Sequence, residues 1–250
     1  MARPTATALQ WQVEETCLNA WPALREVVFE GWLLRFSEGM TRRGNSANPL
    51  APLRCPELAE CQRLYRRLGL PTIFRVLSFG DPAIDEQLAG AGYTKEGESC
   101  VLHGKIDELE AVPDPDVRLV SVATAEWFAA MSALQNHTPE QALIYRRIVG
   151  QLAIPAAFAL LSASGQPVSL AYGVIHRGLL CYESVIADPL RRRRGYGRRI
   201  IAALAAWARE NGARGACLQV EAGNFPGRAL YDAIGLKQEV YRYHYRREPR

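Results

Sequence analysis

The apolar positions along the chain alternate between a helical spacing of three to four residues and a strand spacing of two. In the first half, this pattern predicts a helix at 13–24, strands at 31–36 and 42–50, a helix at 56–68, a strand at 72–77, a helix at 81–91 and a strand at 99–105. Asp81 directly precedes Pro82, a pair typical of a helix start, because aspartate caps free amides and proline fits the first turn.

The second half repeats this alternation with longer elements. The pattern predicts a strand at 117–122, helices at 124–134 and 139–152, strands at 157–162, 168–176 and 179–186, a helix at 194–211, a strand at 216–221, a helix at 226–234 and a strand at 240–246. Thr124, ahead of Trp127 and Phe128, fits the N-cap of its helix. Between the halves, residues 112–116 read Val-Pro-Asp-Pro-Asp, the best linker candidate in the chain. We therefore expect an α/β protein with domains at 1–112 and 117–250.

Short segments of the two halves also match in order. Residues 47–50 (Ala-Asn-Pro-Leu) echo 187–190 (Ala-Asp-Pro-Leu), and the glycine turn at 91–96 echoes 234–239. A buried strand precedes each glycine turn at a similar distance. This order favours an internal repeat of about half the chain. The alternative is that any two α/β units share helices that end at glycine.

Composition narrows the setting. The 250 residues are 48% apolar and 22% charged, an ordinary globular mixture. No apolar run approaches the roughly 20 residues that cross a bilayer, and residues 1–10 lack the apolar block of a secretory signal. The six cysteines are scattered without a CxxC pair, so we expect no metal site, no disulfide framework and a reducing cytoplasm.

The net charge of +4 is concentrated in a few arginine clusters, and one of them carries the clearest chemistry. A β-branched strand ends at Ala187, and a basic loop containing Gly195 and Gly197 then opens a long helix. The first turn of a helix offers unpaired amides and partial positive charge, and glycine lets the backbone approach an anion closely. This loop is therefore a candidate site for a phosphate-bearing ligand.

Nucleic acids and dinucleotides are two other anionic ligands that bind basic or glycine-rich loops. A nucleic-acid surface usually spreads its charge along a face with interleaved aromatics, whereas this run is tied to the start of one helix. A dinucleotide site requires a third glycine at position 200, which is Ile200. We therefore expect neither nucleic acid nor a dinucleotide at this loop.

Residues 192–197 (Arg-Arg-Arg-Gly-Tyr-Gly) resemble the (Q/R)-x-x-G-x-(G/A) motif of the GCN5-related N-acetyltransferase superfamily. Downstream, Asn224, Tyr231 and the Gly-Leu turn at 235–236 follow the second motif of that superfamily at similar spacing. The resemblance covers residues 117–250. It implies two tandem acyl-CoA N-acyltransferase-like domains, each a mixed, mostly antiparallel sheet flanked by helices, with the first degenerate and the second competent.

The resemblance also implies roles for individual residues, with acetyl-CoA as cosubstrate. The cofactor-binding residues would be Val185, Ile186 and Ala187 for pantetheine, the loop residues Arg192, Arg193, Arg194, Gly195, Gly197 and Arg198 for pyrophosphate, and Asn224 for pantetheine. Tyr231 would protonate the leaving thiolate as general acid. The plain alternatives are a core aromatic for Tyr231 and a helix cap for Asn224.

The proton acceptor is less well defined. Glu183 is the first candidate, although it could instead be a strand residue that faces solvent or an arginine. Some relatives carry glutamate where this chain has Gln219, and Glu221 lies two residues further on the same strand face, which makes it the second candidate.

The first half lacks the glycine loop and has prolines where backbone donors are needed, so we expect no CoA site there. It could instead shape the acceptor pocket through Arg42, Arg43 and Asn45, unless these belong to a solvated hairpin. The expected activity is direct acetyl transfer to a primary amine of a small molecule or peptide, without a metal or membrane. The alternative is a non-catalytic CoA-binding regulatory module. The sequence leaves the oligomeric state open and allows a homodimer.

Overall fold

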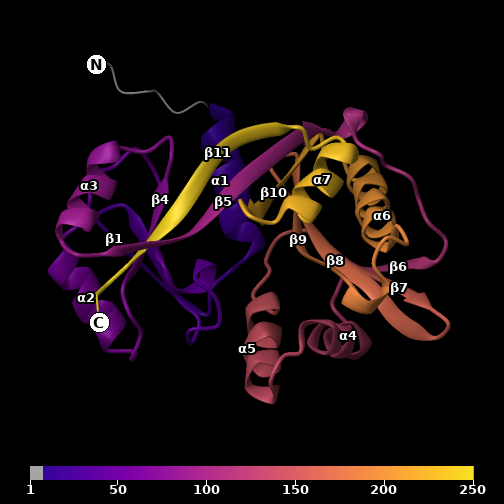
Figure 1. Ribbon diagram of the computed structural model, residues 1–250, viewed down its shortest axis with the longest axis horizontal. Coiled ribbons are helices and arrows are strands. Elements are labelled where there is room, and N and C mark those ends of the chain that lie inside the picture. Colours follow the sequence, from indigo (N-terminus) through magenta and orange to yellow (C-terminus); the bar gives the residue numbers. More distant parts are fainter. Residues whose placement is uncertain (1–7, 250) are drawn as a thin grey trace.

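The computed structural model describes residues 8–249, which form one continuous mixed sheet flanked by helices (Figure 1). The strands are β1 Arg25–Phe29, β2 Trp32–Phe36, β3 Ala47–Pro49, β4 Ile73–Leu77, β5 Thr94–Lys105, β6 Val117–Val120, β7 Ala156–Ala163, β8 Gln166–His176, β9 Leu179–Ala187, β10 Gly215–Glu221 and β11 Gln238–Arg247. Their order is β1-β2-β3-β4-β11-β5-β10-β9-β8-β7-β6. Neighbours are antiparallel except β3–β4 and β9–β10. Most of the expected signal-free segment 1–10, and the last residue of the domain 117–250, lie outside the described residues.

Helices cover both faces of this sheet. They are α1 Ala8–Ala20, α2 Leu58–Arg66, α3 Pro82–Gly90, α4 Ala125–Gln135, α5 Pro139–Val149, α6 Tyr196–Glu210 and α7 Phe225–Ala233. One apolar core contains α1, α4 and α5, while α6 and α7 form a second core and α2 and α3 a third. Along β10, Cys217 belongs to the first core and Leu218 to the second, so these cores lie on opposite faces. No helix within residues 8–249 is long and apolar enough to cross a membrane.

The helix starts follow the local chemistry that the sequence indicated. The Asp81 side chain accepts a hydrogen bond from the amide of Ala83, and Pro82 occupies the first turn of α3. Thr124 caps α4 in the same way, accepting from the amide of Trp127 at 3.1 Å. These contacts span two or three residues, which explains why the sequence alone predicts them.

The expected strand at 42–50 is wrong over its first half. Arg43–Asn45 form a short 3-10 turn, and β3 begins only at Ala47. The cause is Asn45, whose buried side-chain oxygen accepts from the amides of Ser37 at 2.8 Å and Gly39 at 3.0 Å. Strand β1 was not expected, because it is an exposed edge strand whose residues lack a buried face.

The last strand of each half pairs with strands of the other half. β11 pairs with β4 and β5, and β5 in turn pairs with β10. In Figure 1 the yellow β11 runs from α7 across to the side of α2, where the chain ends. The linker at 112–116 therefore separates two parts of the sequence but does not interrupt the sheet.

Apart from the edge strand β6, strand order is symmetric about the β11–β5 pair. Moving outward, β4 corresponds to β10, β3 to β9, β2 to β8 and β1 to β7, and each half contains one parallel pair, β3–β4 or β9–β10. Of the matched segments, 47–50 contains β3 (Ala47–Pro49) and 187–190 begins at the last residue of β9, the equivalent strand. We propose that residues 1–112 and 117–250 are two copies of one repeat that exchange their final strands.

Candidate active site

Strands β9 and β10 separate near the middle of the second half. Their parallel pairing ends at Cys181 and Cys217, beyond which the two strands diverge. A bulge bends β9 just after this point, because Ser184 has a left-handed φ of 52° and the β8–β9 register shifts there. The diverging stretch contains the predicted pantetheine-binding residues Val185, Ile186 and Ala187. The unpaired stretch between β9 and β10, called the opening below, is where the extended arm of a cosubstrate would add as a strand.

The predicted pyrophosphate loop closes one end of this opening. Asp188 caps a short turn at Pro189–Arg191, and two left-handed residues, Arg193 (φ 59°) and Gly195 (φ 73°), then lead into α6 at Tyr196. Gly195 is the N-cap residue, and no side chain caps the helix. The first-turn amides of a fifteen-residue helix are thus available to an anion.

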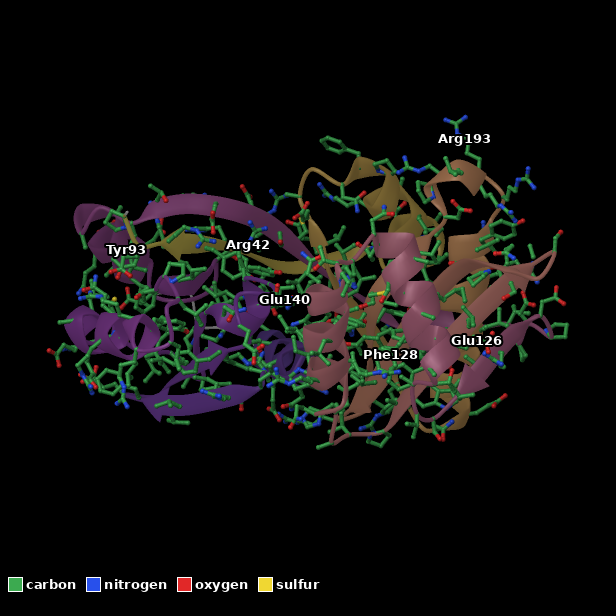
Figure 2. All side chains as sticks on the ribbon, turned by 90° about the horizontal axis from the view of Figure 1, so that it is seen from below. Arg42, Tyr93, Glu126, Phe128, Glu140 and Arg193 are labelled. Carbon is green, nitrogen blue, oxygen red and sulfur yellow. The ribbon has the colours of Figure 1, made fainter. Side chains whose placement is uncertain are left out.

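The arginines around this loop divide into two groups. Arg192, Arg193 and Arg194 are exposed and make no hydrogen bond or ion pair with the described residues, and Arg193 projects from the surface in Figure 2. Two others bind acids in the linker region: Arg198 contacts Glu110 at 2.5 Å, and Arg199 contacts Asp114 and Asp116, both at 2.6 Å. The side chains free to meet a phosphate are therefore those before the helix.

Tyr231 lies on α7 beside the opening. Its side chain is 8% exposed, and its hydroxyl makes no hydrogen bond within residues 8–249. Burial, with a contribution from the negative charge of Glu183, raises the pKa of Tyr231 to about 12. The hydroxyl therefore keeps its proton at neutral pH, as a general acid must.

Asn224 stands at the start of α7 and acts there as a helix cap. Its side-chain oxygen accepts from the amide of Gly227 at 3.0 Å. This contact matches the plain alternative that the sequence offered. A contact between Asn224 and pantetheine stays a prediction, and it would have to use the remaining amide group.

Glu183 is buried on the opposite side of the opening and faces an arginine. Both its oxygens accept from Arg43, with Nη1–Oε1 at 2.7 Å and Nη2–Oε2 at 2.9 Å. Arg43 also lies 4.5 Å from the ring centre of Trp21 and donates to the side-chain oxygen of Gln219 at 3.3 Å. Burial raises the pKa of Glu183, and the Arg43 guanidinium opposes that rise. The role of Glu183 as proton acceptor stays a prediction.

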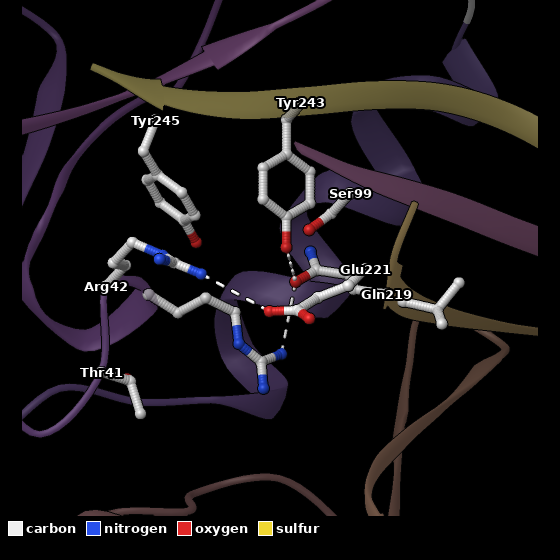
Figure 3. Close-up of a pocket in the computed structure, with 9 residues that line it drawn as sticks. Thr41, Arg42, Ser99, Gln219, Glu221, Tyr243 and Tyr245 are labelled. Carbon is white, nitrogen blue, oxygen red and sulfur yellow. Dashed lines mark hydrogen bonds and ion pairs between the residues drawn. The ribbon is translucent and has the colours of Figure 1, made fainter. Parts of the chain in front are cut away.

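A pocket of about 200 Å³ adjoins this ion pair (Figure 3). It is lined by Thr41, Arg42, Arg43, Ser99, Gln219, Val220, Glu221, Tyr243 and Tyr245. Arg42 and Arg43 come from the first half of the chain and Gln219 and Glu221 from the second, so both halves form the walls. Asn45, the third polar candidate, is not among these residues and instead holds the turn before β3 together.

The equivalent region of the first half carries different residues. By the repeat, Leu88 occupies the position of Tyr231, and Cys55-Pro56-Glu57 replaces the glycine loop. A cavity of about 10 Å³ beside β3 and β4 is lined by Arg75 and Asp81 and by apolar residues that include Trp11, Trp32, Leu53 and Ile84. That the first half holds no CoA stays a prediction.

Three cysteines that are far apart in the sequence meet beneath the opening. The thiols of Cys17 in α1, Cys181 in β9 and Cys217 in β10 all lie within 4.8 Å of one another, and all three residues are buried. Their spacing gives no metal motif, so sequence reasoning missed the cluster. Three thiols at such separations are also a possible ligand set for a soft metal ion. The expected absence of a metal therefore stays a prediction.

Comparisons of the sequence match one family model and a relative from Bacillus subtilis. A family model described as "Probable histone acetyltransferase Rv0428c C-terminal" matches residues 7–246. The uncharacterized N-acetyltransferase YobR of Bacillus subtilis (strain 168) is 25% identical over 242 residues, which cover 94% of this chain and 97% of YobR.

Two solved structures resemble the whole arrangement. A GCN5-related N-acetyltransferase from Kribbella flavida has a TM-score of 0.66 at 18% identity and covers 98% of this chain and 94% of its own. A tandem GNAT protein from the clavulanic acid biosynthesis pathway has a TM-score of 0.63 at 14% identity, covering 81% of this chain and 74% of its own. The tandem acyltransferase fold expected from the sequence is therefore confirmed. The chain belongs to the family of the probable histone acetyltransferase Rv0428c C-terminal region, within the GCN5-related N-acetyltransferase superfamily, and is an acetyl-CoA-dependent N-acetyltransferase.

Proposed function

We propose that the protein moves acetyl from acetyl-CoA directly to a primary amine of a small molecule or peptide. The observation that carries this proposal is the opening between β9 and β10, which has different chemistry on its two faces. Tyr231 and the α6 loop belong to the face covered by α6 and α7. Gln219 and Glu221 share the opposite face with Cys217, beside the pocket. The thioester would approach from the first of these faces and the amine from the second, and they would meet at the opening between β9 and β10.

Proton transfer follows from this arrangement. The ammonium group loses one proton to give a neutral amine, whose nitrogen bonds to the acetyl carbon. The attached nitrogen loses a second proton to solvent as the tetrahedral intermediate collapses, the C–S bond breaks, and Tyr231 protonates the sulfur. Glu221 suits the first step better than Glu183, because Glu221 lines the pocket and is exposed, whereas both oxygens of Glu183 accept from Arg43. Replacing each by glutamine tests both candidates, since losing the true proton acceptor removes the acidic limb of the rate profile.

A covalent acetyl-enzyme finds no support. Cys181 and Cys217, the thiols at the end of the β9–β10 pairing, are both 0% exposed. A substrate cannot reach a nucleophile without surface access. The proposal is therefore direct attack by the amine, which predicts sequential rather than ping-pong kinetics.

Binding of CoA tests the loop directly. Gly195→Ala should weaken CoA binding about ten- to a hundredfold, because a hydrogen bond to a charged group contributes roughly 1.5–3 kcal/mol and the added methyl disturbs the N-terminal amides of α6. Gly212→Ala is the matched control. Both glycines have a left-handed φ, 73° and 83°, and in neither case would a Cβ meet another atom within 4 Å. Calorimetry should show a loss for the first variant only; equal losses, or none, would contradict the loop assignment.

Turnover separates the enzyme from a CoA-binding regulatory module. Release of free CoA thiol should rise when primary amines are added to the protein and acetyl-CoA. A protein that binds acetyl-CoA and releases no thiol with any amine in a broad panel would favour the regulatory alternative.

A further inference from the structure

The pocket beside the opening holds one cation and one anion that face each other from different halves. Arg42 Nη2 lies 3.5 Å from Glu221 Oε1, and their side chains are 36% and 72% exposed (Figure 3). This separation is longer than a good hydrogen bond, and exposed pairs are held weakly. A ligand with opposite charges could therefore replace the pair at little cost.

Arg42 is the pocket arginine whose charge is available to a ligand. The neighbouring Arg43 binds both oxygens of the buried Glu183, which neutralises it. Arg42 has no such partner: its longer contact to Glu221 is its only ion pair within residues 8–249. A carboxylate entering the pocket would accordingly be drawn to Arg42.

Gly97 and Tyr245 lie next to the Arg42 guanidinium. Gly97 has a left-handed φ of 62°, and the β5–β11 register shifts beside it, which marks a bulge. A Cβ on Gly97 would lie 2.8 Å from Arg42 Cζ, so the guanidinium lies in space that the absent side chain of Gly97 leaves open. On another side, Arg42 Cζ is 5.4 Å from the ring centre of Tyr245. A planar guanidinium supported in this way presents its edge to a carboxylate.

The anionic side of the pocket lies toward the reacting end. Gln219 and Glu221 share one face of β10, the strand that borders the opening. The Gln219 side-chain oxygen already accepts from the hydroxyl of Tyr243 at 3.1 Å and from Arg43 at 3.3 Å. Glu221 is therefore the carboxylate free to attract an ammonium group before its nitrogen attacks.

We infer that the acceptor is a small primary amine that also carries a carboxylate, an amino acid or close analogue, with its carboxylate on Arg42 and its amine beside Glu221. The inference rests on the proposed function and names its substrate class. A lysine side chain within a protein places no carboxylate next to its amine, so it would leave Arg42 without a ligand.

The test compares each amino acid with its own carboxamide, which keeps the amine and side chain but removes the carboxylate. Release of CoA thiol should give a kcat/KM at least tenfold higher for the acids. Arg42→Ala should remove this preference, mainly by raising KM for the acids, so that acids and carboxamides show similar kcat/KM values. Arg42→Lys should restore part of the preference for acids, because lysine keeps the positive charge but cannot donate two parallel hydrogen bonds to a carboxylate.

Arg118→Ala is the matched control, since Arg118 is an exposed arginine paired with Glu126 on β6 and α4, outside the pocket. It should change neither acids nor carboxamides, and thermal melts should show both alanine variants folded. Equal rates for acids and carboxamides, or faster acetylation of a lysine peptide with blocked ends, would overturn the inference. If no amine releases thiol, the proposed function fails. In that case, calorimetric titration of amino acids into the CoA complex of the unchanged protein and of Arg42→Ala still tests the binding site. Equal affinity for both proteins would overturn the inference.

Discussion

Arg43 and Glu183, 140 positions apart in the chain, form a two-pronged ion pair that joins the two halves beside the opening. Glu183 is 3% exposed and comes from β9, while Arg43 comes from the turn before β3. The pair thus connects the half that carries the acetyltransferase motifs to the half that lacks them. It also supports one wall of the acceptor pocket.

Removing Arg43 should destabilise the protein strongly. Arg43→Met leaves a buried carboxylate without its partner, and breaking a buried pair in this way typically costs about 3–5 kcal/mol of unfolding free energy. Urea denaturation at neutral pH measures the loss. Arg147→Met is the control, because Arg147 pairs with Glu38 at the surface and should cost roughly 1 kcal/mol or less. Equal stability of both variants would show that the Arg43 pair contributes nothing.

The same variant should depend on pH in a defined direction. Burial raises the pKa of Glu183, and without Arg43 nothing of comparable strength opposes that rise. A group with a raised pKa binds more protons in the folded state, so its contribution to stability is complete below its ordinary pKa of about 4.3 and is lost as pH rises through the raised value. The deficit of Arg43→Met should therefore shrink from pH 8 toward pH 5. A deficit independent of pH would mean that Glu183 is not left charged and alone.

Tyr231→Phe should slow turnover without weakening CoA binding. General acid catalysis contributes about 10²–10⁴ in rate, and the pKa of about 12 keeps Tyr231 protonated throughout the assay range, so kcat should fall by a similar factor at every pH. Tyr182→Phe is a suitable control, since Tyr182 is also buried but donates to the carbonyl of Ile201. Steady-state rates and calorimetry check both variants. An unchanged kcat for Tyr231→Phe would point to another acid.

Each chain should bind a single CoA. Strands β9 and β10 stop pairing at Cys181 and Cys217, and the glycine loop follows β9, whereas the first half has Cys55-Pro56-Glu57 in place of that loop. Calorimetric titration should therefore give one site per chain. A stoichiometry of two would contradict the assignment of CoA to the second half alone.

The thiols should be inert in the folded protein. Cys55 is the least buried of the six cysteines, and burial still raises its pKa to about 11, so little thiolate exists near neutral pH. A chromogenic thiol reagent should react slowly with the native protein. After denaturation, it should react rapidly with all six thiols. Fast native reaction of two or more thiols would show that the core around Cys17, Cys181 and Cys217 opens readily.

The sequence by itself determined the features that depend on a few neighbouring residues. The caps at Asp81 and Thr124, the left-handed Gly195 and the start of α6 are fixed by contacts within about one helical turn, so local residue types suffice to predict them. The acetyltransferase motifs belong to the same class, because the proposed pyrophosphate contacts would use consecutive backbone amides of one loop. The helical spacing of apolar residues also predicted the bounds of most helices to within a few residues.

Only the tertiary structure decided which distant residues meet. The exchange of β5 and β11, the Arg43–Glu183 pair and the three-thiol cluster join segments that no local pattern connects. Asn45 shows the same limit, since its contacts to the turn before it converted a predicted strand into a 3-10 turn. The physical reason is that burial and charge pairing act through space: a buried carboxylate requires a partner, but only the folded sheet determines which arginine provides it.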